Sequence, residues 1–206
     1  MADYNAKIAP FINHVFYVTA QAGVYPSGGY HSGLDISTGT GTRGQNLYSI
    51  CNGTVIRTAY NDGGYGYYII IKDNESDYAF LFAHMCEPAH VSEGQQISKG
   101  QQFGVEGATG NVTGLHVHIE MQNYVANGNK WIFASGDSSK WGTVYLDATS
   151  YMGFPNQLGI SVIYDGTIPD NPNPPTPDEP SEPITKKKSK FPFVLLKKKI
   201  NQRRYY

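Results

Sequence analysis

Six histidines and the carboxylates near them are the residues whose types and spacing suit chemistry. The sharpest pattern is His116-Val117-His118. Alternate side chains of a β-strand share a face, so on a strand these two imidazoles lie side by side with Cα atoms roughly 6.5–7 Å apart. That spacing suits one imidazole bound to a metal and the other beside it, and Glu120 continues the same face. Two surface histidines on a strand also occur by chance.

A second pattern places His31 and Asp35 on either side of Gly33, within His-Ser-Gly-Leu-Asp. In a straight strand the two side chains would sit about 13 Å apart. That is too far to share an ion whose ligand bonds are about 2 Å long. Gly33 permits a bend that brings them together. The alternative is a polar, Gly-rich loop in which both residues are incidental.

Together these patterns offer two imidazoles and one carboxylate, a donor set that leaves Zn²⁺ with a net charge of about +1 and an open fourth position. No His-Glu-x-x-His motif supplies a general base. We therefore expect a surplus histidine to do so, and His116 sits beside His118. His84 closes an apolar strand, where a structural histidine is the alternative. Cys51 and Cys86 are too few for a four-thiolate site, and we expect buried structural thiols.

The elements that must position these residues are strands. Three segments are rich in β-branched and aromatic residues, 52–60, 65–73 and 78–85, and apolar and polar residues alternate in a fourth, 115–122. Asn-Asp-Gly-Gly between the first two predicts a hairpin turn. Glycines at 94, 100, 104 and 107 break the next stretch into very short strands and bends. We predict a mainly β fold of antiparallel sheets, with short helices at most in 3–16 and 131–141.

Composition divides the 206 residues into three regions. We predict a globular domain over 1–168, a linker rich in Pro, Asp and Glu over 169–183, and a cationic tail over 184–206. Seven Lys and two Arg lie in 186–206, leaving seven basic against 17 acidic residues before them. An acidic body argues against a nucleic-acid partner. No apolar run is long enough to cross a bilayer, and the start lacks a Sec-type signal.

The motifs His-Ser-Gly-Leu-Asp, Phe-Ala-His-Met and Leu-His-Val-His-Ile-Glu, in this order and spacing, resemble the lysostaphin/LytM-type zinc endopeptidases, which cleave peptidoglycan cross-links. The Gly-punctuated run before the last motif and the hairpin before the middle one resemble that family too. The resemblance covers roughly residues 20–125. It implies the LytM/lysostaphin-like fold, a duplicated hybrid motif whose antiparallel sheets form an open groove.

The resemblance also implies the role of each polar residue in these motifs. The zinc ligands would be His31, Asp35 and His118, one zinc ion per chain. His116 would be the base, and His84 would stabilise the transition state.

Two positions depart from the family pattern without removing a ligand: Phe82 stands where Tyr is frequent, and Met85 where Leu is usual. Glu120 is a candidate to orient a neighbouring imidazole through its other nitrogen, the alternative being an exposed solubilising residue. Three tyrosines flank the site in the sequence and are candidate walls of a substrate groove: Tyr30, Tyr65 and Tyr67.

The function expected is hydrolysis of peptide bonds in peptidoglycan stem peptides or cross-bridges at the bacterial cell wall. A phage lysin or virion-associated peptidase and a secreted enzyme are the alternative origins. One competing function is a non-catalytic wall-binding or virion structural module with the same fold; another is a zinc carboxypeptidase or amidase. The tail, Lys186–Tyr206, is expected either to be a solvated terminus or to bind anionic wall polymer, a membrane surface or a virion subunit.

Overall fold

The computed structural model describes residues 2–166. The predicted linker and cationic tail, and the domain boundary at 168, lie outside the described residues. None of the helices in the described part is long and apolar enough to span a bilayer. The strands are β1 (Tyr4–Asn5), β2 (Val15–Ala20), β3 (Leu34–Ser37), β4 (Arg43–Tyr48), β5 (Gly53–Asn61), β6 (Gly66–Asp73), β7 (Tyr78–Met85), β8 (Gln96–Ile97), β9 (Gln102–Gly107), β10 (Val117–Asn123), β11 (Tyr145–Leu146) and β12 (Ser161–Ile163).

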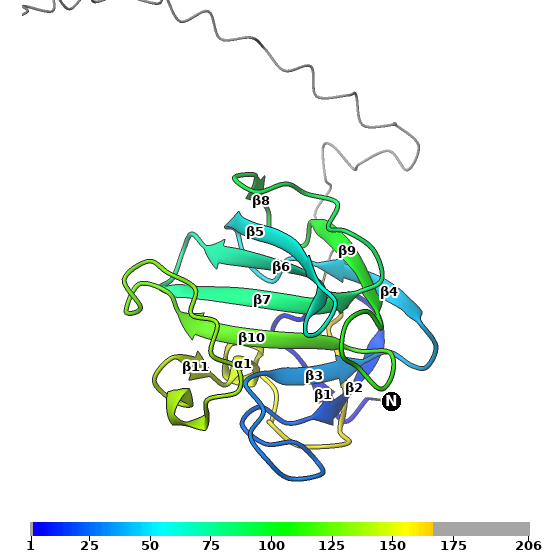
Figure 1. The fold of residues 1–206 in the computed structure, drawn as a ribbon. Coiled ribbons are helices and arrows are strands. Elements are labelled where there is room, and N and C mark those ends of the chain that lie inside the picture. Colours follow the sequence, from blue (N-terminus) through cyan, green and yellow to red (C-terminus); the bar gives the residue numbers. More distant parts are fainter. Residues whose placement is uncertain (1, 167–206) are drawn as a thin grey trace, which may run out of the picture. The chain divides into compact units, whose positions relative to one another are not determined.

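The strands form one large and one small sheet (Figure 1). The large sheet has the order β1-β12-β2-β3-β10-β7-β6-β5-β8, with β11 also paired to β10. The small sheet pairs β4 with β9. All pairs between these strands are antiparallel except the parallel pair of β1 with β12. The predicted mainly β, antiparallel fold is therefore confirmed.

The four predicted strands correspond to β5, β6, β7 and β10, and the hairpin turn falls between β5 and β6 as expected. The Gly-punctuated run contains only the short strands β8 and β9, again as expected. Residues 3–16 hold no helix: they contain β1 and the start of β2, because pairing with β12 gives them distant partners. Residues 131–141 contain one 3₁₀ turn, η1 (Ser138–Lys140).

One short helix, α1 (Ala148–Met152), was not predicted. The side chain of Asp147 caps its first turn by accepting from the backbone N–H of Thr149, and Gly153 ends it in the left-handed conformation with φ 80°. Such a short segment has too few turns to display a helical period in the sequence.

The large sheet buries apolar side chains on both faces, and β10 shows how the faces differ. Val117, Ile119 and Met121 pack into the main core, together with Phe82 of β7. The alternate residues, beginning with His118, point to the opposite face. There a smaller apolar cluster over β6 and β7 is covered by the segment after β10, including Tyr124 and Trp131. The remainder of that face carries the site.

The two cysteines differ in burial. Cys51 lies in the main core, as predicted for a structural thiol. Cys86 follows the last residue of β7 and is only partly buried, so the expectation of burial is wrong for this residue. Its Sγ accepts a hydrogen bond of 3.1 Å from Arg43, whose guanidinium also pairs with Glu87. Cys86 lies at the protein surface because β7 ends immediately before it.

Candidate metal centre and catalytic site

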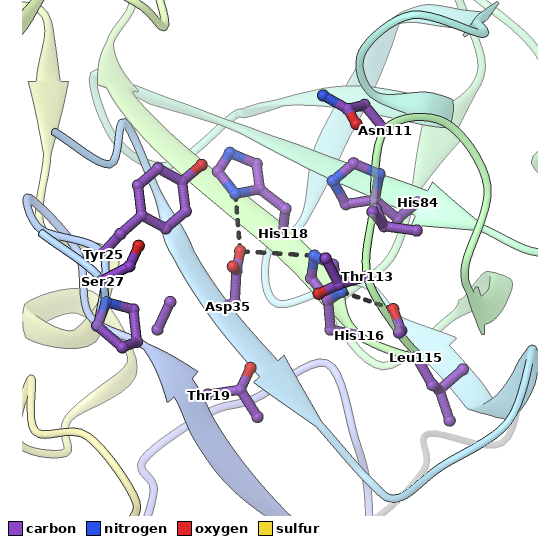
Figure 2. Close-up of a pocket in the computed structure, with 14 residues that line it drawn as sticks. Thr19, Tyr25, Ser27, Asp35, His84, Asn111, Thr113, Leu115, His116 and His118 are labelled. Carbon is purple, nitrogen blue, oxygen red and sulfur yellow. Dashed lines mark hydrogen bonds and ion pairs between the residues drawn. The ribbon is translucent and has the colours of Figure 1, made fainter. Parts of the chain in front are cut away.

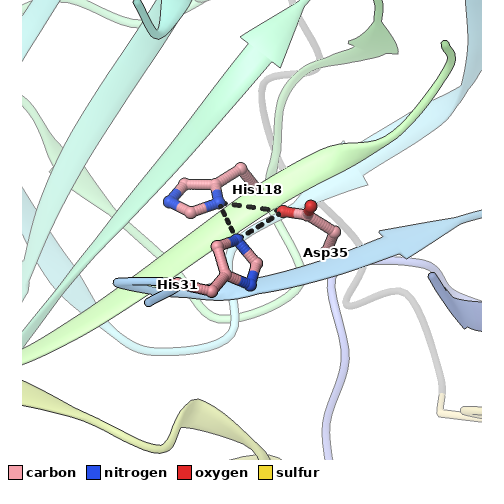
Figure 3. A group of neighbouring side chains, drawn as sticks. All are labelled: His31, Asp35 and His118. Carbon is pink, nitrogen blue, oxygen red and sulfur yellow. Dashed lines mark hydrogen bonds and ion pairs between the residues drawn. The ribbon is translucent and has the colours of Figure 1, made fainter. Parts of the chain in front are cut away.

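Three side chains from two distant segments of the sequence converge on the open face of the large sheet (Figure 3). His31 Nε2 lies 3.2 Å from Asp35 Oδ1 and 3.0 Å from His118 Nδ1. His118 Nδ1 lies 2.8 Å from Asp35 Oδ1. Donors about 2.0–2.1 Å from a tetrahedral Zn²⁺ stand about 3.3 Å apart, so this triangle matches the spacing a single zinc ion requires after a small expansion.

Strand pairing and a glycine bring the three residues together. Asp35 of β3 and His118 of β10 are directly opposite in the antiparallel register, so their side chains share a face. His31 precedes β3, and Gly33 lets that segment press against β10. A Cβ at position 33 would collide with the carbonyl oxygen of Ile119 and the ring of His118. The expected bend at Gly33 therefore has a definite cause, the close approach of backbone to β10.

The protons on the two imidazoles decide what the cluster can bind. His31 Nδ1 donates to the carbonyl oxygen of Gln21 at 2.7 Å, which leaves Nε2 with a lone pair. His118 Nε2 lies 3.2 Å from Glu120 Oε1, a carboxylate oxygen that accepts its proton. Three electron-rich atoms can face one another at 3 Å only with a cation among them, either a proton on His118 Nδ1 or a metal ion. The donor set therefore fits a divalent metal.

Charge near His118 favours that proton when no metal is bound. Burial lowers the pKa of His118, but the hydrogen bonds and negative charges of Asp35 and Glu120 outweigh burial and raise it to about 10. Burial likewise opposes ionisation of Asp35, but hydrogen bonds from His118 and His31 hold the pKa of its carboxyl well below the usual range. A metal entering this site therefore displaces a proton from His118.

Glu120 lies directly behind His118 and is fully buried. Its Oε1 accepts hydrogen bonds from Ser32 Oγ at 2.6 Å and Tyr65 OH at 2.8 Å, besides facing His118 Nε2. The predicted position of Glu120 against the other nitrogen of an imidazole is thus the one observed. An exposed solubilising role does not fit this burial. Ser32 was not singled out from the sequence, where a serine in a Gly-rich loop carries no distinctive pattern.

Replacing Glu120 by glutamine should weaken zinc affinity by roughly 10–100-fold, the usual cost of losing a partner behind a metal ligand. Glutamine keeps the size of the side chain but removes the negative charge that orients His118. Competition against a chromophoric chelator measures the change. Glu93→Gln is the matched control, because Glu93 is exposed and its side chain accepts a hydrogen bond from the backbone of Thr58, outside the site. Equal zinc affinity of the Glu120→Gln and wild-type proteins would show that Glu120 does not contribute to metal binding.

His84 and His116 face the same pocket as the cluster (Figure 2). Their ring centroids are 4.7 Å apart, and His116 Nε2 lies 3.8 Å from Asp35 Oδ1. Each imidazole donates its Nδ1 proton to a backbone carbonyl at 2.9 Å, His84 to Thr109 and His116 to Gly114. In the neutral form, both rings therefore carry their remaining lone pair on Nε2, where a proton can be accepted.

A β-bulge turns His84 toward the pocket. Phe80 and Phe82 point into the main core, and strict alternation along β7 would place the side chain of His84 in the same core. Between the pairs Tyr67↔Met85 and Ile69↔Phe82, however, β7 has one more residue than β6. His84 takes up the difference with φ 64°, a left-handed conformation that is unusual for a residue other than glycine. The bulge presents the imidazole to the site and returns Met85 to the core.

His84 is neutral at ordinary pH. Burial lowers its pKa first, the nearby imidazoles of His118 and His116 lower it further, and together they bring it to about 3. A neutral ring that donates Nδ1–H to Thr109 can donate from Nε2 only after it has accepted a proton there. The transition-state role expected for His84 therefore requires prior protonation of Nε2.

Two pockets meet at these residues. One of about 630 Å³ extends past β2 and the segment before His116, and another of about 370 Å³ extends past Tyr30 and Tyr65. Tyr25, His84, Asn111 and His118 line both. The pockets therefore form one groove that passes the metal centre.

Two of the three candidate groove tyrosines lie in this groove. Tyr30 and Tyr65 line the smaller pocket, and the buried hydroxyl of Tyr30 has no hydrogen-bond partner in the described part of the chain. Tyr67 lines neither pocket. It packs against the main core, with its ring 4.6 Å from that of Tyr60, because it lies on the other face of β6. The structure does not bring Tyr67 to the site.

Tyr25 is the clearest residue that the sequence reasoning missed. Its ring stacks on His31 with centroids 4.1 Å apart. Burial and the negative charges of Asp35 and Glu120 raise the pKa of its phenol, so the hydroxyl keeps its proton and can donate. The segment around Tyr25 has no alternation of apolar and polar residues. The one signal in the sequence that could have indicated Tyr25 is its position six residues before His31.

A groove on a β-sheet, with two imidazoles and a carboxylate converging in it beside two further imidazoles, is the arrangement of a metallohydrolase. The sequence pattern of peptidase family M23 matches residues 29–131. This chain belongs to peptidase family M23. That family membership agrees with the resemblance expected from the motifs. No curated protein sequence shows a significant match to the chain.

Solved structures of M23 peptidases share the fold. The catalytic domain of the prophage-encoded M23 protein EnpA from Enterococcus faecalis, in a mutant form, is 22% identical with a TM-score of 0.52, over 71% of this chain and 98% of that one. The antimicrobial peptidase lysostaphin from Staphylococcus simulans is 21% identical with a TM-score of 0.52, over 66% of this chain and 49% of that one. The chain thus spans about half the length of lysostaphin.

Proposed function

We propose that this M23 peptidase is a zinc-dependent endopeptidase that hydrolyses peptide bonds in the stem peptides or cross-bridges of peptidoglycan, at the bacterial cell wall. The observation that supports it best is the convergence of His31, Asp35 and His118 beside two adjoining pockets, with His118 lining both of them and Asp35 the larger one. A peptide chain can pass through such a groove, which suits cleavage inside a chain better than removal of a terminal residue.

His31 Nε2, Asp35 Oδ1 and His118 Nδ1 would hold the zinc ion, and His31 and His118 are each oriented by an acceptor at their other nitrogen. In such a site zinc is a Lewis acid that polarises a carbonyl group and acidifies water. Because both rings are already oriented in this way, metal binding requires little side-chain movement beyond the loss of the proton on His118 Nδ1.

The two remaining imidazoles provide the proton transfers in this proposal. His116 Nε2, held by the bond from Nδ1 to Gly114, accepts the proton of the attacking water. His84, whose ring centroid is 4.7 Å from that of His116, can take this proton on its unprotonated Nε2 and then donate it in a hydrogen bond to the developing oxyanion. Tyr25 adds a second donor to the same pocket. All three side chains line the larger pocket, so they face the space in which a scissile carbonyl would be placed.

Uncharged hydrogen-bonding groups suit a peptide substrate. Asn111 lines both pockets, Thr19 and Thr113 line the larger one, and Ser135 lines the smaller one. These side chains can donate to and accept from peptide groups, which alternate N–H and C=O along their length. The groove therefore matches the backbone of an uncharged peptide segment.

Digestion of purified sacculi tests the proposal. Sacculi from Gram-positive and Gram-negative walls are treated with the zinc-loaded protein, with and without chelator, and the products are identified by mass spectrometry. We expect new amino groups from cuts inside stem peptides or cross-bridges, only without chelator, and none with His118→Ala. Binding to sacculi without new amino groups would indicate a non-catalytic module instead. Release of single terminal residues would indicate a carboxypeptidase, and release of whole peptides from the sugar chain an amidase.

A further inference from the structure

The unusual backbone of His84 requires support from outside its own strand. A left-handed residue in the middle of a sheet costs free energy and persists only where neighbouring contacts hold it. The backbone N–H of His84 donates to the carbonyl oxygen of Tyr65 at 2.8 Å, which fixes one side of the bulge. On the other side, one residue of the segment between β9 and β10 contacts both β6 and β7.

That residue is Thr109, which contacts the bulge at three points. Its hydroxyl donates to the carbonyl oxygen of Met85 at 2.7 Å and accepts from the backbone N–H of Tyr67 at 3.0 Å. Its own carbonyl oxygen accepts from His84 Nδ1 at 2.9 Å. The hydroxyl thus bridges β6 and β7 where their register shifts, and the carbonyl fixes which nitrogen of His84 carries the proton.

Glycines allow Thr109 to reach this position. Gly66 has φ +60°, and a Cβ there would collide with the hydroxyl and backbone of Thr109. A Cβ at Gly110 would likewise collide with the backbone of Gly64 and Gly66. Asn111 N–H donates to the carbonyl oxygen of Gly64 at 2.9 Å. The segment 109–111 is therefore locked against the β5–β6 hairpin by direct contact of backbones.

We propose that Thr109 is a positioning residue for catalysis, acting through the bulge to hold the unprotonated Nε2 of His84 in the groove, where it can take up the proton that it then donates to the oxyanion. The inference rests on the proposed function, because it assigns His84 a part in the reaction. It assigns Thr109 no contact with the metal or with substrate. Within residues 2–166, none of the three metal-binding side chains forms a hydrogen bond with Thr109. Zinc affinity should therefore not depend on Thr109.

Thr109→Val tests this role because valine keeps the shape of threonine but removes both hydroxyl hydrogen bonds. We expect kcat on sacculi to fall by up to about 100-fold, the cost of misplacing a reacting group by about 1 Å, with KM and zinc content unchanged. Thr109→Ser restores the hydroxyl and should restore most of kcat. In a His84→Ala background, Thr109→Val should have no further effect, because the residue it positions is absent.

The tautomer of His84 provides a measurement that needs no substrate. Long-range ¹H–¹⁵N spectra of the zinc-loaded wild type should show His84 as one tautomer, protonated at Nδ1 and unprotonated at Nε2. In Thr109→Val, His84 should no longer be held in this one tautomer. An unchanged His84 spectrum in Thr109→Val would overturn the inference. So would equal loss of kcat with and without His84. A wild-type protein that cuts no sacculi refutes the proposed function instead, while the spectra still test Thr109.

Two glycines of the β5–β6 hairpin, one in the turn and one at the start of β6, supply a second test. Gly66→Ala pushes Thr109 away and should reproduce the effect of Thr109→Val on the His84 spectrum and on kcat. Gly63→Ala is the matched control, since a Cβ there meets only Asn61 Oδ1 at 4.0 Å and Gly63 has no left-handed φ. If Gly66→Ala folds with the wild-type melting temperature and leaves the His84 spectrum and kcat unchanged, the locked contact has no positioning role.

Discussion

His118→Ala should lose stable zinc binding while the protein remains folded. His118 Nδ1 is within 3.0 Å of both other donors, so its loss leaves only His31 and Asp35. The fall in zinc affinity should exceed the roughly 10–100-fold expected for a partner behind a ligand. Equilibrium dialysis with metal analysis measures it, and circular dichroism checks the fold.

His14→Ala is the matched control for this variant, because His14 is an exposed histidine outside the site. It should bind one zinc ion with wild-type affinity. Retention of one tightly bound zinc ion by His118→Ala would show that the metal is held elsewhere in the chain.

His116→Ala should lower the rate of peptide hydrolysis by about 10²–10⁴-fold, the usual contribution of a general base. His84→Ala should lower it by about 10²–10³-fold, the cost of losing a donor to an oxyanion. Both variants should keep zinc, because neither ring provides one of the three clustered donor atoms. Initial rates on sacculi, normalised to measured zinc content, separate this effect from loss of metal.

His90→Ala controls for the removal of an imidazole, since His90 pairs with Glu87 away from the groove. Its rate should equal that of the wild type. A fully active His84→Ala protein would refute the role of His84, and a fully active His116→Ala protein would refute that of His116. Loss of zinc in either variant would assign that residue to the metal instead.

The central strands were predictable because their residues have strong local preferences. β5, β6 and β7 are rich in β-branched and aromatic residues, and the turn between β5 and β6 contains glycine, so pairing with the next strand follows from sequence order. The pairing of β1 and β2 with β12 was not predictable. It joins residues about 150 positions apart, and β1 and β12, with two and three residues, are too short to show a periodicity.

The candidate site was predictable where residue type carries the chemistry. Histidine and aspartate at positions 31, 35 and 118 are ligand types, and the expected bend at Gly33 agrees with the close approach to β10. The direction of His84 could not be predicted, because alternation along β7 places it with Phe82 in the core and only the bulge reverses it. Tyr25 and Thr109 act from irregular loops, where position depends on contacts between distant segments.

A crystal structure of the zinc-loaded protein tests the central claim most directly. We predict a single ion bound by two imidazole nitrogens and one carboxylate oxygen, those of His31, His118 and Asp35, with the fourth position left to a non-protein ligand and facing the groove. An ion enclosed by four protein donors, or bound with these three side chains turned apart, would contradict the account.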